Sequence, residues 1–182
     1  AGYDNQGGER NTITGWYSGE NLTSGSYNTA YGANSLDQCQ TGSDNCVFGY
    51  TAAKKCTGSL NTVMGRSAGL DMTSANSNVI VGNRAAFSIS SASDNVIIGD
   101  RAAYSSLSTG SNNTIIGHDA EASSSSVSNE VTIGDTNVTK FRIPGININF
   151  SSTTGNSFSS DGQFVSARWT LGANGSSHYT FT

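Results

Sequence analysis

Cysteine and histidine are the residues with the most versatile chemistry in this chain, and both are scarce. The cysteines are Cys39, Cys46 and Cys56, and the two histidines are His118 and His178. Neither residue type shows the Cys-x-x-Cys, nucleophile-elbow or phosphate-loop spacing that catalysis or cofactor binding uses. The sequence therefore predicts a protein that is not an enzyme and that has no cofactor and no metal site.

Charged side chains recur at two adjacent positions of a repeat that spans most of the chain. The first position holds Asp100, His118 and Asp135, and the second holds Arg84, Arg101 and Asp119. Carboxylates near a histidine are compatible with a bound cation, whereas mixed signs are typical of a solvated surface stripe. We favour the stripe, because no two carboxylates are paired across a predicted cleft.

Aromatic residues gather near the two ends of the sequence. Trp16 and Tyr17 belong to the first group, and Trp169 and Tyr179 belong to the second. Exposed rings stack on sugars, so each group is a candidate contact for a receptor. Aromatic side chains also cover the ends of repeat structures and block edge-to-edge association, which is the interpretation that we favour.

The repeat that positions these residues is marked most regularly by a glycine. The residue number rises by 17 from one glycine to the next, with one step of 16 and one of 18, and the glycines are Gly15, Gly32, Gly49, Gly65, Gly82, Gly99, Gly117 and Gly134. A period of this size is typical of a solenoid, in which each repeat is one coil stacked on the next. We predict an all-β solenoid of about eight coils, each of about 17 residues.

An asparagine stands four residues before the glycine in every repeat except the last. This column consists of Asn11, Asn28, Asn45, Asn61, Asn78, Asn95 and Asn113. Stacked coils would place these side chains ~4.8 Å apart, so we predict a ladder in which each amide bonds its neighbour or caps the preceding turn. The four residues from the asparagine to the residue before the glycine are rich in β-branched types and predict a short strand.

An apolar column eleven residues after the asparagine predicts a second strand in each coil. It consists of Leu22, Cys39, Cys56, Met72, Ile89 and the polar exception Ser106. The two cysteines of this column are one repeat apart and should lie in adjacent coils, about 5 Å from each other, within the range that a disulfide tolerates. Both a disulfide and two reduced apolar side chains fit the column, and an extracellular location would permit the bond.

The first predicted strand of each coil is apolar on both faces. Its middle residue faces one way and its two neighbours face the other, as in Val96, Ile97 and Ile98. A strand with two apolar faces is buried on both, and a single coil of this length is too thin to cover both by itself. We therefore predict an obligate oligomer, and a shared central core favours a homotrimer.

The composition argues against two kinds of partner, nucleic acid and the membrane interior. The net charge is −4 and no basic run occurs, so the sequence predicts no binding of nucleic acid. No apolar run reaches the length of a spanning helix, so we expect no membrane insertion. The first residues show neither an initiator Met nor a signal-peptide pattern, and we expect a fragment or a trimmed chain.

The repeat divides the chain into three segments. Residues 1–8 are Gly-rich and predict a flexible lead-in, and the solenoid is expected over 9–145, where Pro144 stops the stack. Residues 146–182 predict a small C-terminal β module, with a polar linker over 151–160 that is followed by a hairpin.

The repeat unit Asn-Thr-x-x-Gly-x-x-Ala resembles the head repeats of trimeric autotransporter adhesins and the related repeats of bacteriophage tail fibres. The segment Glu-Val-Thr-Ile-Gly-Asp-Thr-Asn-Val-Thr-Lys-Phe-Arg-Ile-Pro-Gly, residues 130–145, resembles the end of such repeats in the fibres of marine phages and algal viruses. Residues 169–182 resemble a module common in phage structural proteins. Adhesin repeats are usually shorter than the repeat of this chain. The resemblance implies a homotrimeric, left-handed β-roll.

The resemblance also implies a function, namely a structural and receptor-binding segment of a trimeric viral tail fibre that attaches to the host cell surface. The implied partners are further copies of the chain, other virion fibre or tail proteins, and a host glycan or protein, with an extracellular location on the virion. The alternative is the head of a bacterial trimeric surface adhesin on the cell surface. An ice-binding solenoid is disfavoured, because Cys46, Val79, Val96 and Val131 interrupt the threonine column that it needs.

Overall fold

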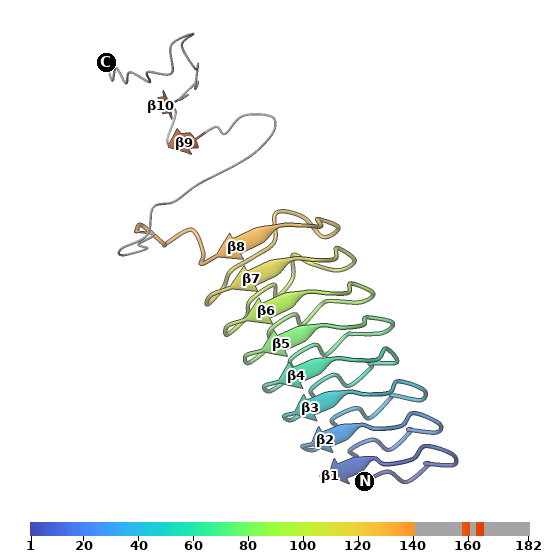
Figure 1. Ribbon diagram of the computed structural model, residues 1–182. Helices are drawn as coiled ribbons and strands as arrows, with labels where there is room; N and C mark the ends of the chain where they lie inside the picture. The colour runs from blue at the N-terminus through green and yellow to red at the C-terminus, as the bar shows by residue number, and fades with distance from the viewer. Residues whose placement is uncertain (141–157, 161–162, 166–182) are drawn as a thin grey trace, which may run out of the picture. The chain divides into compact units, whose positions relative to one another are not determined.

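The computed structural model describes residues 1–140, 158–160 and 163–165, and within these ranges it is all-β. Eight three-residue strands form one parallel sheet in sequence order (Figure 1). They are β1 (Thr12–Thr14), β2 (Thr29–Tyr31), β3 (Cys46–Phe48), β4 (Thr62–Met64), β5 (Val79–Val81), β6 (Val96–Ile98), β7 (Thr114–Ile116) and β8 (Val131–Ile133). Each strand pairs with the equivalent residues of the next repeat, so the chain is a β-solenoid, as predicted, and each coil contributes one strand to the sheet.

The sheet register keeps each repeat position in one column. Ile80 of β5 pairs with Val63 of β4 on one side and with Ile97 of β6 on the other. The shortest repeat, between β3 and β4, and the longest repeat, between β6 and β7, keep the same register. The missing or extra residue is therefore taken up in the loops and not in the sheet.

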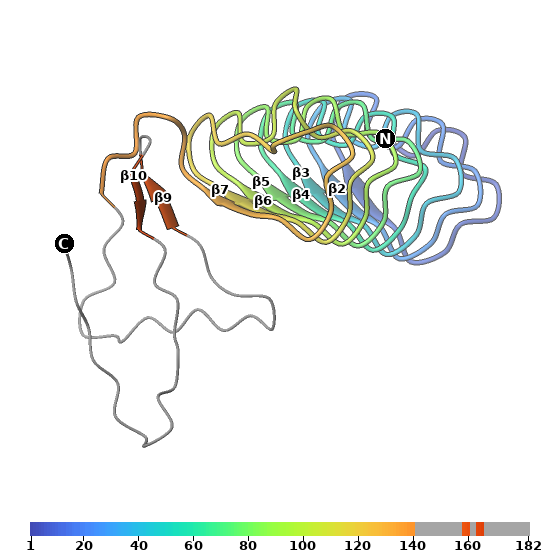
Figure 2. The same cartoon turned by 90° about the horizontal axis from the view of Figure 1, so that it is seen from above.

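The hydrophobic core lies inside the coils. The middle residues of β3 to β7 are fully buried, and so is a column of small residues seven positions after each asparagine, which includes Ala85 and Ala102. Figure 2 shows the strands lined up along one wall of the solenoid, with loops closing each coil on the other side. Each chain thus buries one face of its sheet by itself.

The predicted second strand is wrong, although its column is buried. Leu22, Cys39, Met72 and Ile89 are fully buried, but they lie in irregular backbone just after a turn, and no strand of the described residues contains them. The longest repeat carries its extra residue just before this column, so Leu107 is buried where Ser106 was expected. The part of each described coil that leads back to the sheet therefore consists of successive sharp bends, or corners, and contains no strand.

The corners explain why no second strand forms. In the coil that contains β5, Ser77, Arg84 and Ala86 have φ values of 56°, 55° and 50°, in the left-handed region. The coil glycines have φ values of 84° to 143°. A Cβ atom on Gly82 would also lie 2.1 Å from the carbonyl oxygen of Gly99 in the next coil. These corners bend the chain more sharply than an extended strand permits.

Leu60 occupies one of these corners, and its substitution tests how much the left-handed backbone lowers the free energy of unfolding. Its φ is 63° and 61% of its surface is exposed. Asn112 and Asn129 occupy the same corner of later coils, and asparagine tolerates left-handed backbone better than leucine does. We expect Leu60→Asn to raise the free energy of unfolding by about 1 kcal/mol in a urea titration. The matched control Leu60→Ala should give a smaller gain, and a loss of stability in Leu60→Asn would contradict the corner argument.

The expected flexible lead-in at residues 1–8 is wrong. The backbone N–H groups of Gly2, Asp4 and Gly7 donate to carbonyl oxygens of the next coil at 2.9, 3.0 and 2.9 Å. These residues therefore form the closing loops of a further coil. Their glycines serve the sharp corners, a role that composition alone does not distinguish from flexibility.

The chain divides into two compact units, Ala1–Thr139 and Lys140–Thr182. The second unit contains an antiparallel pair formed by β9 (Phe158–Ser160) and β10 (Gln163–Val165). Residues 158–160 were expected in a polar linker, and this expectation is wrong. An Asp-Gly pair separates the two strands in the sequence, which is a strong hairpin signal. Pro144 and the remainder of the predicted hairpin lie outside the described residues.

Candidate functional site

The asparagine column forms a continuous ladder through the solenoid. From Asn28 to Asn113, each backbone N–H and each side-chain Nδ2 donates to the Oδ1 atom of the asparagine in the preceding coil. The backbone distances are 2.8–3.1 Å and the side-chain distances are 3.0–3.2 Å. Each Nδ2 also donates to a turn carbonyl of the following coil at 2.8–3.1 Å. Since these side chains are buried, the ladder ties neighbouring coils together where water cannot compete.

A second ladder, which the sequence analysis missed, runs beside the first. Two residues before each ladder asparagine from Asn28 onward, and two before Glu130, a hydroxyl or amide oxygen accepts the backbone N–H of the same position in the preceding coil, at 2.8–3.2 Å. The acceptors are Ser26, Ser43, Ser59, Asn76, Ser93, Ser111 and Ser128. The signal in the sequence is the constant offset of these residues, six serines and one asparagine, from the ladder position.

Glu130 ends the asparagine ladder. Its backbone N–H donates to Oδ1 of Asn113 at 2.9 Å, so the last asparagine keeps an acceptor role. The carboxylate accepts hydrogen bonds from the hydroxyl and backbone N–H of Ser123 and from the hydroxyl of Thr132, which together lower the pKa of Glu130. The carboxylate of Glu130 thus joins the two ends of the loop from Ser123 to Glu130.

The outward face of the sheet carries exposed apolar side chains on every strand from β2 to β8. We define the outer wall as the first and third residues of β2 to β8. Its exposed apolar side chains retain 36–69% of their surface, and they are Tyr31, Phe48, Met64, Val79, Ile98, Ile116, Val131 and Ile133. β1 carries Thr12 and Thr14 at the same positions, so the apolar surface begins at the second coil.

The outer wall is long, narrow and regular. Six strand spacings of about 4.8 Å separate β2 from β8, which gives a strip roughly 29 Å long. Tyr31 and Phe48 stack on each other along it, with ring centroids 6.3 Å apart. A strip of this length and one strand in width covers a few hundred Å², the size at which exposed apolar patches mark interaction surfaces.

The charged columns form a stripe on the surface of the later coils. Arg101 contacts Asp119 at 3.0 Å, and His118 lies 3.6 Å from Asp100 and 3.4 Å from Asp119. The side chains in these contacts are a third to two thirds exposed. Among residues 1–140, no group of three or more His, Cys, Asp or Glu side chains is placed to hold a metal ion.

Cys39 and Cys56 are free thiols, which corresponds to the second of the two alternatives, a pair of reduced apolar side chains. Both side chains are fully buried, and each donates a weak hydrogen bond to a turn carbonyl of its own coil, at 3.9 Å for Gly42 and 3.6 Å for Gly58. They therefore serve as apolar core residues, like the leucine and methionine of the same column. Cys46 is the first residue of β3 and is partly exposed on the outer wall.

The buried thiols predict a loss of stability in base. Burial raises the pKa of Cys39 from 9.0 to about 11 and that of Cys56 to about 12, and the neighbouring charge of Cys39 adds to the second shift. The folded chain keeps these protons above pH 9 whereas the unfolded chain releases them. Their contribution to stability is therefore complete below pH 9 and is lost as the pH rises. We expect the free energy of unfolding to fall by up to about 1.4 kcal/mol per pH unit for each thiol between pH 9 and 11.

A double variant separates the thiols from other groups that titrate in base. Cys39→Leu with Cys56→Met introduces the residues that occupy this column in neighbouring coils. Urea titrations at pH 8, 9, 10 and 11 should show a shallower decline for this variant than for the unmodified chain. An equal decline in both proteins would contradict the assignment.

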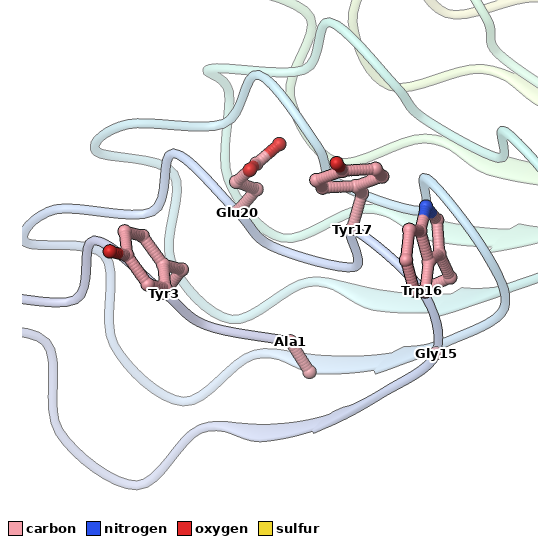
Figure 3. A pocket seen from close by; sticks show the side chains of 6 residues that line it. All are labelled: Ala1, Tyr3, Gly15, Trp16, Tyr17 and Glu20. Carbon is pink, nitrogen blue, oxygen red and sulfur yellow. The ribbon is translucent and has the colours of Figure 1, made fainter.

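An open hollow of about 450 Å³ lies on the first coils. Ala1, Tyr3, Gly15, Trp16, Tyr17 and Glu20 line it (Figure 3). The rings of Trp16 and Tyr17 meet edge to face, with centroids 5.0 Å apart and planes at 83°. The structure thus brings together two of the predicted receptor-contact residues, and it adds Tyr3 and Glu20 to them. Trp169 and Tyr179 lie outside the described residues.

Within the described ranges, no helix is long and apolar enough to cross a membrane. No protein-family model, curated protein or solved structure matches the chain. The functional inference therefore depends on the ladders, the outer wall and the aromatic hollow.

Proposed function

We propose that this chain is a structural and receptor-binding segment of a homotrimeric viral tail fibre, which attaches the particle to the surface of its host cell. The observation that carries the proposal is the outer wall, because a soluble chain gains little by exposing a regular apolar strip along a rigid sheet. In the trimer, the three outer walls would face one another along the fibre axis. Covering each large apolar side chain would contribute about 1–2 kcal/mol, and the strip holds eight of them.

The two ladders support a mechanical role. They add side-chain hydrogen bonds between coils to the backbone pairing of the sheet, and those of the asparagine ladder are shielded from water. Each coil is thereby linked to the next on the sheet side and in the loops. A stack of this kind resists bending and local opening, as a segment that transmits load between a particle and a cell must do. Three copies on one axis would also present each surface feature three times, which raises the avidity for a repeated host receptor.

The assembly is tested by the mass of the protein in solution. Light scattering after size-exclusion chromatography should return three times the chain mass of 18.8 kDa. In the same sample, Cys46 on the outer wall should react slowly with iodoacetamide, because the other chains cover it. A stable folded monomer with rapid labelling of Cys46 would overturn the proposal.

A further inference from the structure

We propose that the hollow formed by Tyr3, Trp16, Tyr17 and Glu20 binds a neutral pyranose ring of a cell-surface glycan. This inference rests on the proposed role in attachment and assigns a ligand class and a site to it. The site lies in the coil loops, and none of these four residues belongs to the outer wall. A trimer formed through the outer wall would therefore leave the hollow on each of its three chains.

The aromatic rings of the hollow are exposed and yet fixed in place. Trp16 keeps 72% of its surface exposed and Tyr3 keeps 85%. The edge of Tyr17 packs against Trp16. Backbone hydrogen bonds from Gly2 to Ser18 and from Asp4 to Glu20 hold the segment around Tyr3 on the coil, at 2.9 and 3.0 Å. A site that is already ordered loses little conformational freedom when a ligand binds.

The hollow combines the faces of aromatic rings with a single carboxylate, that of Glu20. The apolar C–H face of a pyranose packs on an aromatic ring, and its hydroxyl groups donate to a carboxylate. Glu20 lines the hollow, is partly buried, and its side chain makes no hydrogen bond or ion pair to any residue of 1–140. Its carboxylate oxygens are therefore free to accept hydrogen bonds from a ligand.

The shape of the hollow distinguishes between two ligands that aromatic rings attract, a quaternary ammonium group and a sugar ring. A quaternary ammonium group needs ring faces that converge within about 6 Å of one point. In Figure 3, Tyr3 and Trp16 stand on either side of Ala1, while Tyr17 and Glu20 lie between them along one edge. The rings thus border an open surface, and its volume of about 450 Å³ suits an extended ligand of one or two sugar rings.

The test uses the full chain and an array of immobilised neutral, amino and sialylated oligosaccharides. The unmodified protein should bind neutral members of the array. Trp16→Ala and Glu20→Gln should each weaken this binding by about tenfold or more, since each removes one of the two kinds of contact. Tyr50→Ala is the matched control, because Tyr50 occupies the position of Trp16 two coils later, is 52% exposed and does not line the hollow. Its binding should equal that of the unmodified protein.

A second readout places the ligand at the indole. The chain has two tryptophans, so Trp169→Phe leaves Trp16 as the sole indole. Its fluorescence should change when the neutral oligosaccharide selected on the array is titrated into this variant. Binding that is insensitive to Trp16→Ala, binding of amino or sialylated members only, or no binding would overturn the inference. The mass of each sample is measured separately, so a trimer without glycan binding refutes this inference alone, whereas a monomer refutes the proposed function.

Discussion

Asn78→Leu is expected to lower the free energy of unfolding by roughly 2–6 kcal/mol, the largest loss among the substitutions considered. The side chain of Asn78 has five hydrogen-bond contacts in the middle of the buried ladder, three that share the two N–H groups of Nδ2 and two on Oδ1. Leucine has a similar size but neither donates nor accepts. It would leave the backbone N–H of Asn95 and the carbonyl of Ala92 buried without these partners, and each such group costs about 1–3 kcal/mol.

Urea unfolding followed by circular dichroism measures this loss. Asn83→Leu is the control, because Asn83 is exposed in the same coil and its side chain makes a single hydrogen bond, to Asp100 at 2.6 Å. Its effect should stay within about 0.5 kcal/mol. Equal losses in the two variants would mean that the ladder contributes no more than an ordinary surface asparagine.

Ile98→Lys combined with Ile116→Lys is expected to convert the proposed trimer into a folded monomer. Both side chains point outward from the sheet and are 38% and 36% exposed, whereas their neighbours Ile97 and Ile115 fill the core of the chain. Three chains would bring six ammonium groups into one dry interface, where unpaired charges are strongly unfavourable. The fold within each chain keeps its core and its ladders.

Light scattering measures the result, with an expected mass of 18.8 kDa for the double variant. Ser91→Lys combined with Thr109→Lys adds the same charge at exposed loop positions outside the outer wall, and this control should keep the mass of the trimer. Circular dichroism should show a folded solenoid in both proteins. A double variant that keeps the trimer mass would show that the outer wall is not the interface.

Much of the solenoid was predictable because a stack repeats its environment every coil. The glycine period predicted the solenoid and its coils of about 17 residues. The pattern from asparagine to glycine predicted a strand of four residues, of which the three after the asparagine form the strand. The asparagines were assigned to one column, and in it they bond to one another. The return path was not predictable in the same way. It depends on left-handed corners at residues such as Ser77 and Ala86, which have no composition in common that would identify such a corner.

The candidate sites also contain residues that the sequence identified and residues that only the structure brought together. Trp16 and Tyr17 were recognised as possible contacts from their residue types, and Glu20 lies beside them in the same coil. Tyr3 joins them only because the chain before the first strand packs as a further coil. The spacing of the two core cysteines placed them in adjacent coils. Spacing alone did not decide whether the sulfur atoms bond to each other, and the structure holds each thiol on a carbonyl of its own coil.

The sequence by itself determined which residues share a column, because a constant period places equivalent side chains one above another. It also showed that Val96, Ile97 and Ile98 make both faces of a strand apolar. Only the tertiary structure decided which face lies inside the chain. The loops close over the middle residue, where the column of small residues that includes Ala102 leaves room for a tight corner. Ile97 is therefore buried, and Ile98 remains exposed on the outer wall.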